Sequence, residues 1–486
     1  MKKLSVIIFL LALLGCAEKK KHYEPNWESF HQYEVPEWFK DGKIGIYFHW
    51  GPYSVPAHKT EWYSHYMYVD GHEINQYHKK QYGPLDEFGY KDFIPMFKAE
   101  KFDADAWAEL FAKSGAKYAG PVAEHADGFA MWDSDLTKWD AADMGPKQDI
   151  VGKMAQAIRK QGLKFVTTFH HQWLYAWYPT WDENTDASNP EYEDLYGPRV
   201  PDSAWGYHPN PMPDKAFNDR WYDRVVEVVD KYQPDLVWFD SKLHIIDEQY
   251  RLNFLSHYYN KAEQWDKGVV CTYKHEAYKP FAAVLDLERG RLDSLRKRIW
   301  LTDTSVDKAS WCYIENPDYK SVNVLIDNLV DRVSKNGNTL LNVGPRPDGT
   351  IPQPQKDRLL AMGKWLDING EAIYGTRYWK RYGEGPTQIK GGSFIDKKDV
   401  NYTAEDIRFT KKDNLLFAIA LAWPEDQITI QSLKELDPDK IKSVSLLGHG
   451  NHLDWNLKES GLVIKVPGEK PCNHAYSFKI EYAEPL

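Results

Sequence analysis

Residues 222–240 read YDRVVEVVDKYQPDLVWFD and contain the pattern that decides the fold. Residues 222–232 carry four valines within a polar stretch, which predicts an amphipathic helix. After Pro234, residues 236–239 form a short apolar run that is typical of a buried strand. The run stops at Asp240. The stretch therefore predicts a helix, then a buried strand, then a carboxylate at the end of that strand.

The same helix and strand pattern recurs along most of the chain. Repeated units of this kind favour a parallel sheet covered by helices. Further strands are predicted at 44–48, 118–123 and 165–169, and further helices at 105–111 and 150–161.

Ionisable side chains follow the predicted strands at the point where each strand ends. In a (β/α)8 barrel the carboxyl ends of the strands form the active-site face. An open doubly wound sheet also binds ligands there, but the chain has no GxGxxG motif and the number of units favours a barrel. The strand-end residues are His49, His125, His170 and Asp240.

The pattern changes after about residue 385. Short runs of alternating residues separated by turn residues predict a small β-sandwich. These runs are 407–410, 415–420, 427–430, 444–447 and 462–466. We therefore predict an α/β chain in three parts: a signal segment (1–16), a catalytic (β/α)8-like barrel (17–380) and a C-terminal β-sandwich domain (381–486).

The N-terminus has the pattern of an export signal. Lys2 and Lys3 precede an apolar stretch over 4–14, which is too short to span a bilayer. The stretch leads into Leu13-Leu14-Gly15-Cys16, which resembles a bacterial lipobox. An ordinary signal peptide with an incidental cysteine is the alternative. We expect an exported protein that is attached to the bacterial envelope, on its periplasmic or outer-membrane face, through a lipid on Cys16.

Charge and cysteine usage exclude several classes of function. The formal net charge is −10, and phosphate binding needs clustered Lys and Arg, so a nucleic-acid partner is not expected. The abundant Trp and Tyr residues predict a large aromatic core, and are also suited to a cleft that packs against sugar rings. Neither a metal site nor a cofactor is predicted, because the chain has no CxxC motif or Cys/His cluster. Three cysteines besides Cys16 are expected to be mostly buried thiols: Cys271, Cys312 and Cys472.

Two carboxyl groups are candidates for the chemistry. Asp240 follows a strand and is flanked by aromatic residues, although Asp is also common as a helix N-cap. Glu288 lies in Leu285-Asp286-Leu287-Glu288, where Asp286 is a rival and a solvated loop pair is the alternative. A nucleophilic carboxylate paired with a proton-donating carboxyl group is what a retaining glycosidase requires.

Several motifs together resemble the α-L-fucosidases of glycoside hydrolase family 29. They occur in the order of that family and cover roughly residues 25–380. The motifs are Lys43-Ile44-Gly45-Ile46-Tyr47-Phe48-His49-Trp50-Gly51-Pro52, Glu61-Trp62-Tyr63, Glu124-His125-Ala126-Asp127-Gly128-Phe129, Gly145-Pro146-Lys147-Gln148-Asp149, Asn336-Gly337-Asn338-Thr339-Leu340-Leu341-Asn342-Val343-Gly344-Pro345 and Asn369-Gly370-Glu371-Ala372-Ile373-Tyr374.

The resemblance implies an exo-acting retaining glycosidase that cleaves terminal α-L-fucosyl residues from glycans or oligosaccharides. It implies that Asp240 is the nucleophile and that Glu288 is the acid/base, with Asp286 as the rival. The positions that it implies for sugar contact are His49, Glu61, Trp62, His125, His170, Trp238 and Trp311.

One departure from the family leaves the sugar open. The family usually has two consecutive histidines before Asp127-Gly128-Phe129, and here the second position is Ala126. Losing a hydrogen-bonding side chain weakens the discrimination between sugars and enlarges the pocket. An α-L-galactoside or α-L-glucoside is therefore an alternative substrate. A catalytically inactive sugar-binding lipoprotein is a further alternative, which the presence of both Asp240 and Glu288 disfavours.

Overall fold

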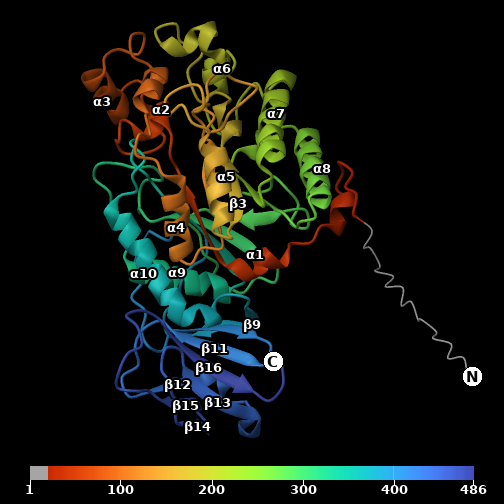
Figure 1. The fold of residues 1–486 in the computed structure, drawn as a ribbon, viewed down its shortest axis with the longest axis vertical. Coiled ribbons are helices and arrows are strands. Elements are labelled where there is room, and N and C mark those ends of the chain that lie inside the picture. Colours follow the sequence, from red (N-terminus) through yellow and green to blue (C-terminus); the bar gives the residue numbers. More distant parts are fainter. Residues whose placement is uncertain (1–19, 398, 486) are drawn as a thin grey trace, which may run out of the picture.

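The computed structural model describes residues 20–397 and 399–485. Eight parallel strands close into a barrel in the order β1 to β8, and two antiparallel sheets follow at the C-terminal end (Figure 1). The predicted α/β barrel followed by a β-sandwich is therefore confirmed. The predicted signal segment, with Cys16, lies outside the described residues. None of the helices in the described ranges is long and apolar enough to cross a bilayer.

The barrel strands are short and almost entirely buried, as strands covered on both faces should be. The barrel closes because β1 pairs with both β2 and β8, so that Ile46 lies between Ala119 and Leu341. The strands are β1 (Ile44–Phe48), β2 (Tyr118–Glu124), β3 (Lys164–Phe169), β4 (Leu236–Phe239), β5 (Val270–Tyr273), β6 (Val284–Asp286), β7 (Trp300–Ser305) and β8 (Gly337–Val343).

Helices cover the outside of the barrel, and several begin at a side-chain cap. The side chains of Asp103, Asp149 and Asp214 each accept a hydrogen bond from a backbone N–H in the first turn. The helices are α1 (Glu37–Gly42), α2 (Tyr63–Tyr66), α3 (Glu73–Gln81), α4 (Ala104–Lys113), α5 (Ile150–Lys160), α6 (Glu193–Tyr196), α7 (Lys215–Tyr232), α8 (Glu248–Gln264), α9 (Val322–Ser334) and α10 (Gln353–Asn369). In the described chain no helix lies between β5 and β6 or between β6 and β7.

The interior of the barrel is filled by side chains from its strands. Tyr118, Val166, Val270 and Leu340 belong to one buried cluster with other inward-facing residues. Three cysteines were predicted to be mostly buried. Cys271 and Cys312 are buried, and Cys472 is half-buried. Because the interior is packed, any ligand must enter from the carboxyl ends of the strands.

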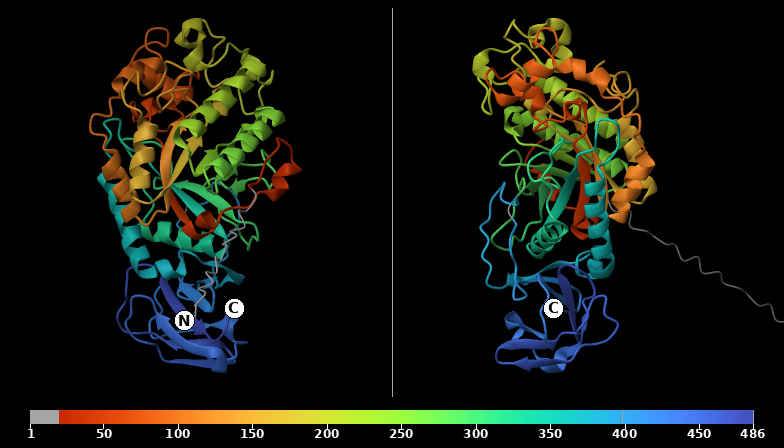
Figure 2. Two further views of the ribbon diagram at one scale, coloured as in Figure 1. Left: turned by 45° about the vertical axis from the view of Figure 1, so that its right-hand side comes forward. Right: turned by 90° about the vertical axis from the view of Figure 1, so that its left-hand side faces the viewer.

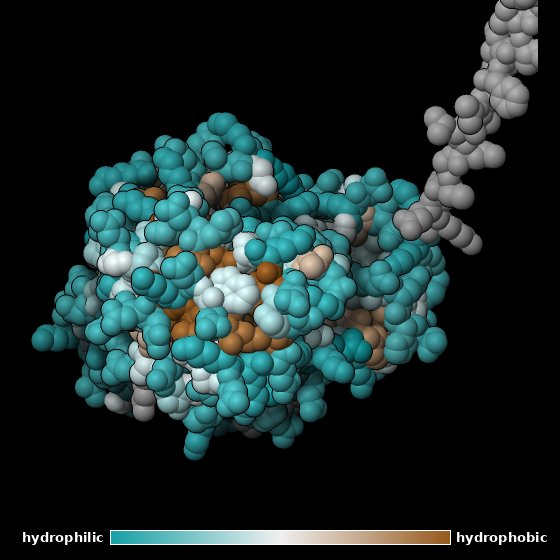
Figure 3. All heavy atoms as spheres, turned by 90° about the horizontal axis from the view of Figure 1, so that it is seen from below, coloured by the Kyte–Doolittle hydropathy of each residue, from teal (hydrophilic) through white to brown (hydrophobic). Residues whose placement is uncertain are grey.

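The C-terminal region forms two sheets around a second core. The larger sheet has the order β13-β16-β11-β10-β9, and the smaller has the order β12-β15-β14. Seen from this end of the molecule, the surface is largely hydrophilic around a central area of apolar residues (Figure 3). The strands are β9 (Arg377–Glu384), β10 (Ile407–Lys412), β11 (Leu415–Ala420), β12 (Gln427–Ile430), β13 (Ile441–Leu446), β14 (Trp455–Lys458), β15 (Gly461–Lys465) and β16 (Tyr476–Tyr482).

The connection from β9 to β10 returns to the barrel. In Figure 2 (right) it rises from the sandwich and runs beside the barrel. Residues 391–396, which we call the strap, form hydrogen bonds with the β6–β7 connection. Arg291 and Gly392 exchange two backbone hydrogen bonds of 3.1 and 2.9 Å, and Phe394 N–H donates to the carbonyl of Glu288. The strap therefore packs along a connection that has no helix of its own.

Candidate active site

A pocket of about 460 Å³ opens at the carboxyl ends of the barrel strands. Its size is within the range of small-molecule sites. All nine residues that the sequence analysis assigns to the site line this pocket: His49, Glu61, Trp62, His125, His170, Trp238, Asp240, Glu288 and Trp311. The strand-end rule accounts for His49, His125, His170 and Asp240, whereas the other five positions were implied by the family resemblance.

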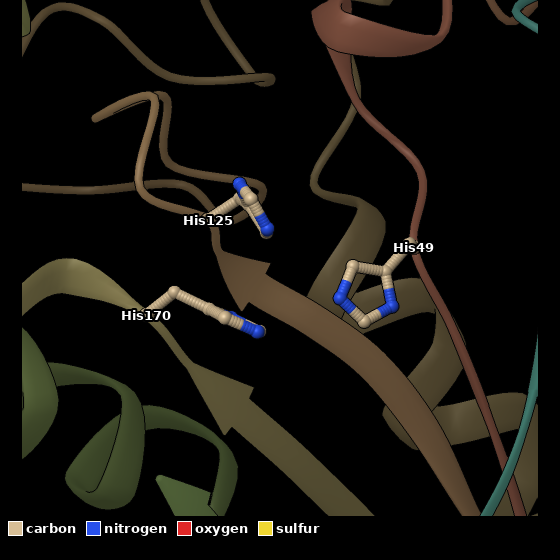
Figure 4. A group of neighbouring side chains, drawn as sticks. All are labelled: His49, His125 and His170. Carbon is tan, nitrogen blue, oxygen red and sulfur yellow. The ribbon is translucent and has the colours of Figure 1, made fainter. Parts of the chain in front are cut away.

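Three histidines form one wall at the base of the pocket. His49, His125 and His170 follow β1, β2 and β3 directly, and their rings turn toward a common space (Figure 4). Each is at least 96% buried. Burial lowers the pKa of His49 to about 4 and lowers the pKa values of the other two further below the usual range. The three rings are therefore neutral at neutral pH, and each can offer a nitrogen lone pair.

The tautomer of His49 follows from its neighbour. The Asn342 amide nitrogen donates to the carbonyl of Trp311 and to Ser305 Oγ, so its Oδ1 must be the acceptor. This oxygen lies 2.8 Å from His49 Nδ1, which is therefore protonated. The Nε2 atom of His49 consequently has a free lone pair.

The other two histidines have nitrogens ready for a ligand. The Nδ1 atoms of His125 and His170 are buried and have no hydrogen-bond partner among the described residues. Buried polar atoms of this kind need a partner, which a sugar hydroxyl can provide. The ligand atoms of the three histidines lie within 4.8 Å of one another, so neutral imidazoles could also hold a transition metal here.

Glu61 joins two loops at the side of the pocket. Its carboxylate accepts a hydrogen bond of 3.0 Å from the backbone N–H of Trp311. Burial raises the pKa of Glu61. The indole of Trp62 packs on Trp173 and Trp177, with ring centroids 5.1 and 4.6 Å away. The loop after β1 thus presents a carboxyl group and a fixed aromatic face to the pocket.

A single ammonium group connects the two candidate catalytic carboxylates. Lys274 Nζ lies 3.0 Å from Asp240 Oδ1 and 2.6 Å from Glu288 Oε2. It also lies 3.4 Å from Asp303 Oδ2, and 4.7 Å from the ring centroid of Trp238. Asp240 and Glu288 side chains are 16% and 18% exposed, whereas Lys274 is only 4% exposed. The two carboxylates reach the pocket, and the buried ammonium of Lys274 contacts both of them.

The electrostatics of this group raise the pKa of Glu288. Burial, opposed by Lys274, raises the pKa of Glu288 to about 7, and the nearby charges of Asp303 and Asp240 contribute to the increase. Burial opposes the charge on Lys274, but the surrounding carboxylates, Asp240 first among them, raise its pKa well above the usual range. A carboxyl group with a pKa near neutrality beside another carboxylate is suited to donating and accepting a proton at neutral pH.

The structure separates Glu288 from its rival Asp286. Asp286 is 2% exposed and is not among the residues lining the pocket. Its carboxylate accepts hydrogen bonds from Trp238 Nε1 at 3.1 Å and from the backbone N–H of Asp303 at 2.9 Å. Asp286 therefore orients the indole of Trp238, and Glu288 is the acidic residue of this segment that faces the pocket.

Ala126 does not lie where the sequence suggested. It is 1% exposed, belongs to the hydrophobic core and does not line the pocket, whereas its neighbour His125 does. The enlargement of the pocket that was expected from Ala126 is thus not seen at the pocket surface. The reason is local: only one of the two consecutive side chains points into the pocket, and the alanine methyl packs into the core.

Several lining residues were missed by the sequence analysis. Lys274 follows β5 directly, so the strand-end rule could have found it. Asp303 lies within β7 and not at its end, so the strand-end rule could not have found it. The remaining missed residues lie inside a strand, in short helical turns or on irregular segments, where no periodic pattern identifies them: Tyr47, Thr60, Tyr66, Trp173, Tyr207, Ser241, His275 and Phe394.

Comparison with known families agrees with this geometry. The sequence profile of the α-L-fucosidase family matches residues 10–371, which include both candidate carboxylates. The chain belongs to the α-L-fucosidase family. The profile of the α-L-fucosidase C-terminal domain matches residues 399–481. This family member is a glycoside hydrolase.

Individual relatives match over nearly their whole length. The rat (Rattus norvegicus) tissue α-L-fucosidase is 32% identical, with 94% of this chain and 92% of the relative covered. The human (Homo sapiens) plasma α-L-fucosidase is 31% identical, with 96% and 93% covered. The structure of Thermotoga maritima α-fucosidase in complex with fucose is 31% identical, with a TM-score of 0.74 and coverage of 94% of this chain and 100% of that chain.

Proposed function

We propose that this glycoside hydrolase is a retaining, exo-acting α-L-fucosidase, with Asp240 as the nucleophile and Glu288 as the acid/base. The observation that carries the proposal is the contact of both carboxylates with Lys274 Nζ. The two contacting oxygens are separated by at most the sum of the two contact distances. This limit on one pair of oxygens is compatible with the roughly 5–5.5 Å that separates the two carboxyl groups of retaining enzymes.

In the first step Asp240 attacks the anomeric carbon and the bond to the leaving oxygen breaks. Glu288 donates its proton to that oxygen, so the aglycone leaves as an alcohol. The products of this step are a β-linked glycosyl ester on Asp240 and an ionised Glu288. The pKa of Glu288 near 7 supports this role, because the group is substantially protonated at neutral pH.

In the second step Glu288 accepts a proton from water while the water oxygen attacks the anomeric carbon. The ester bond to Asp240 breaks, and the sugar leaves with its original α configuration. Both carboxyl groups return to their starting states. The ammonium of Lys274 balances the negative charge that moves between them.

The remaining lining residues are suited to holding one sugar unit. His49, His125 and His170 offer neutral nitrogens to hydroxyl groups, Glu61 offers a carboxyl group, and aromatic faces can pack against C–H groups of the ring. The filled barrel interior closes the base of the pocket, which supports cleavage of terminal residues only. The proposed sugar contacts are His49, Glu61, Trp62, His125, His170, Trp238 and Trp311.

The experiment that tests the mechanism uses azide with two variants. In Asp240→Gly, azide can attack the substrate once and should give the β-L-fucosyl azide. In Glu288→Ala, azide attacks the covalent intermediate and should give the α-L-fucosyl azide. Proton NMR distinguishes the two anomers. Exchanged anomers would reverse the two assignments, and a β-configured first product from the unmodified enzyme would exclude retention.

The sugar itself is tested with aryl α-L-fucoside, α-L-galactoside and α-L-glucoside. We expect the fucoside to have the highest kcat/KM. The burial of Ala126 and its absence from the pocket lining support this expectation. A higher kcat/KM for the galactoside or glucoside would favour the alternative substrates, and no turnover of any would favour an inactive sugar-binding protein.

We also propose that the protein is exported and carries a lipid on Cys16. The motif Leu13-Leu14-Gly15-Cys16 after a basic start and a short apolar stretch supports this proposal. Labelled fatty acid should be incorporated into the unmodified protein and not into Cys16→Ser. Equal labelling of both, or recovery of the unmodified protein in the soluble fraction without a lipid, would contradict it.

A further inference from the structure

The rim of the pocket contains an apolar side chain that the proposed chemistry does not use. Phe394 lines the pocket and is 57% exposed, which makes it one of four large exposed apolar residues in the described chain. The other three, Met96, Leu136 and Met212, are not among the residues that line this pocket. Single exposed apolar residues are common on protein surfaces, but this ring lies at the mouth of a pocket, where it can contact a ligand.

The backbone of Phe394 is held in an unfavourable conformation. Its φ angle is +58°, in the left-handed region that bulky side chains rarely adopt. His275, which also lines the pocket, has a φ angle of +55°. Strained backbone of this kind persists only where the surroundings enforce it.

The surroundings of the strap provide this enforcement. Phe394 N–H donates a 2.9 Å hydrogen bond to the carbonyl of Glu288, and Ile395 N–H donates one of 3.0 Å to the carbonyl of Arg289. Two residues after Phe394, the buried carboxylate of Asp396 contacts Lys320 at 2.9 Å and Arg332 at 3.0 Å. Phe394 is therefore fixed to the segment that carries Glu288 on one side and to buried cations on the other.

The position beside Glu288 identifies which part of a substrate would contact Phe394. The proton donor must touch the leaving oxygen, so the aglycone attached to that oxygen lies next to Glu288 and leaves toward the rim. Trp173 and Tyr207, whose ring centroids are 5.7 Å apart, line the same pocket and supply further aromatic surface. The glycone is enclosed by buried groups, whereas the aglycone meets the half-buried rings of Trp173 and Tyr207 and the exposed ring of Phe394.

The geometry points to an aglycone-binding site for a hexopyranose unit, with Phe394 as its stacking surface. This inference rests on the proposed function. A pyranose ring can place its C–H face on an aromatic ring while its hydroxyl groups remain in water, which a half-exposed ring permits. Through the strap, the C-terminal domain thus helps to determine which leaving group is accepted.

The test compares three substrates that share the same glycone. They are α-L-fucosyl fluoride, which has no aglycone, a disaccharide with fucose α-linked to a hexopyranose, and fucose α-linked to a threonine peptide. In Phe394→Ala, we expect kcat/KM for the disaccharide to fall about tenfold relative to that for the fluoride. Phe394→Trp should retain most of the disaccharide rate, and Leu136→Ala provides a control at a similarly exposed apolar residue outside the pocket.

The outcomes separate the possible failures. If the unmodified protein hydrolyses neither the fluoride nor the disaccharide, the proposed function fails. If it hydrolyses both and Phe394→Ala lowers both equally, the ring acts on the shared glycone and the aglycone site is wrong. If only the disaccharide is affected and the basic limb of its pH profile is displaced, the ring acts through Glu288 and the aglycone site is also wrong. An equal loss on the disaccharide and the peptide would refute selectivity for a sugar aglycone.

Discussion

The base and the rim of the pocket are built in different ways. At the base, side chains such as His49, Asp240 and Lys274 follow barrel strands and are buried or nearly so. At the rim, Tyr207 and Phe394 come from irregular segments and Trp173 from a short 3-10 helix, and all three present aromatic rings. The base holds paired charges in a dry environment, where electrostatic interactions are strong. The rim offers apolar surface to solvent. The difference indicates that the base determines the reaction and the rim determines which leaving group is accepted.

Asp240→Asn is the change with the largest expected effect. Removing the nucleophile should lower kcat about 10⁴-fold or more on every substrate, including the fluoride. Asp235→Asn is the matched control, because Asp235 flanks the other end of β4 and bonds the backbone N–H of Phe165. Steady-state kinetics with both variants measures the difference. A loss of similar size in Asp235→Asn would mean that the strand is disturbed and the chemistry is not being tested.

Lys274→Met should affect both activity and stability. Without the ammonium, the acidic side chains around it repel one another in a buried setting. We expect kcat/KM to fall at least about 100-fold. The free energy of unfolding should decrease by about 3–5 kcal/mol, as is usual when one partner of a buried ion pair is removed.

Denaturant unfolding measures the stability change, and Lys113→Met is its control. The ion pair of Lys113 with Glu109 is exposed, so its loss should have little effect. Lys274→Arg should restore part of the activity. If Lys274→Met were as stable and active as the unmodified enzyme, the ammonium would have no role at the base.

The pH dependence should distinguish the proton donor, Glu288, from the other side chains at the bottom of the pocket. The pKa of Glu288 is raised to about 7, so its protonated fraction falls as the pH rises through that value. For a disaccharide, kcat/KM should therefore decline about tenfold per pH unit above this point. For α-L-fucosyl fluoride, which needs no proton on its leaving group, the same limb should be absent from kcat/KM. A shared basic limb would assign the titration to another group.

Asp396→Asn should have the smallest of these effects and acts on the rim alone. Burial opposes the charge of this carboxylate, but Lys320 and Arg332 hold its pKa well below the usual range. Loss of the charge leaves two buried cations with a weaker partner, so the thermal midpoint should fall. Because the strap is then less firmly held, we expect a few-fold loss on the disaccharide and less on the fluoride. A greater loss on the fluoride would contradict the division between base and rim.

The sequence predicts the base well for a physical reason. A strand of fixed direction ends at one face of the barrel, so His49, His125, His170 and Asp240 must meet there. Glu288 was harder to identify, because Asp286 is only two residues away. What separates them is the buried hydrogen bond between Asp286 and Trp238, a contact between β6 and β4 that no local pattern reveals.

The rim could not be predicted in this way. Phe394 is more than 100 residues downstream of Glu288 and belongs to the connection between two strands of the other domain. Its position depends on the ion pairs of Asp396 with Lys320 and Arg332, which join distant parts of the chain. Ala126 shows the opposite error: a residue adjacent in sequence to the pocket residue His125 packs in the core instead.

The order in which the chain is synthesised gives the strap a further consequence. The last barrel strand, β8, ends at Val343, and the strap follows only after α10 and β9. A nascent chain therefore contains all eight barrel strands, together with Asp240 and Glu288, before residues 391–396 exist. In such a chain the β6–β7 connection has no strap beside it, and the mouth of the pocket lacks Phe394. Full selectivity for the leaving group thus arises late in biosynthesis, after the residues that perform the reaction have already been made.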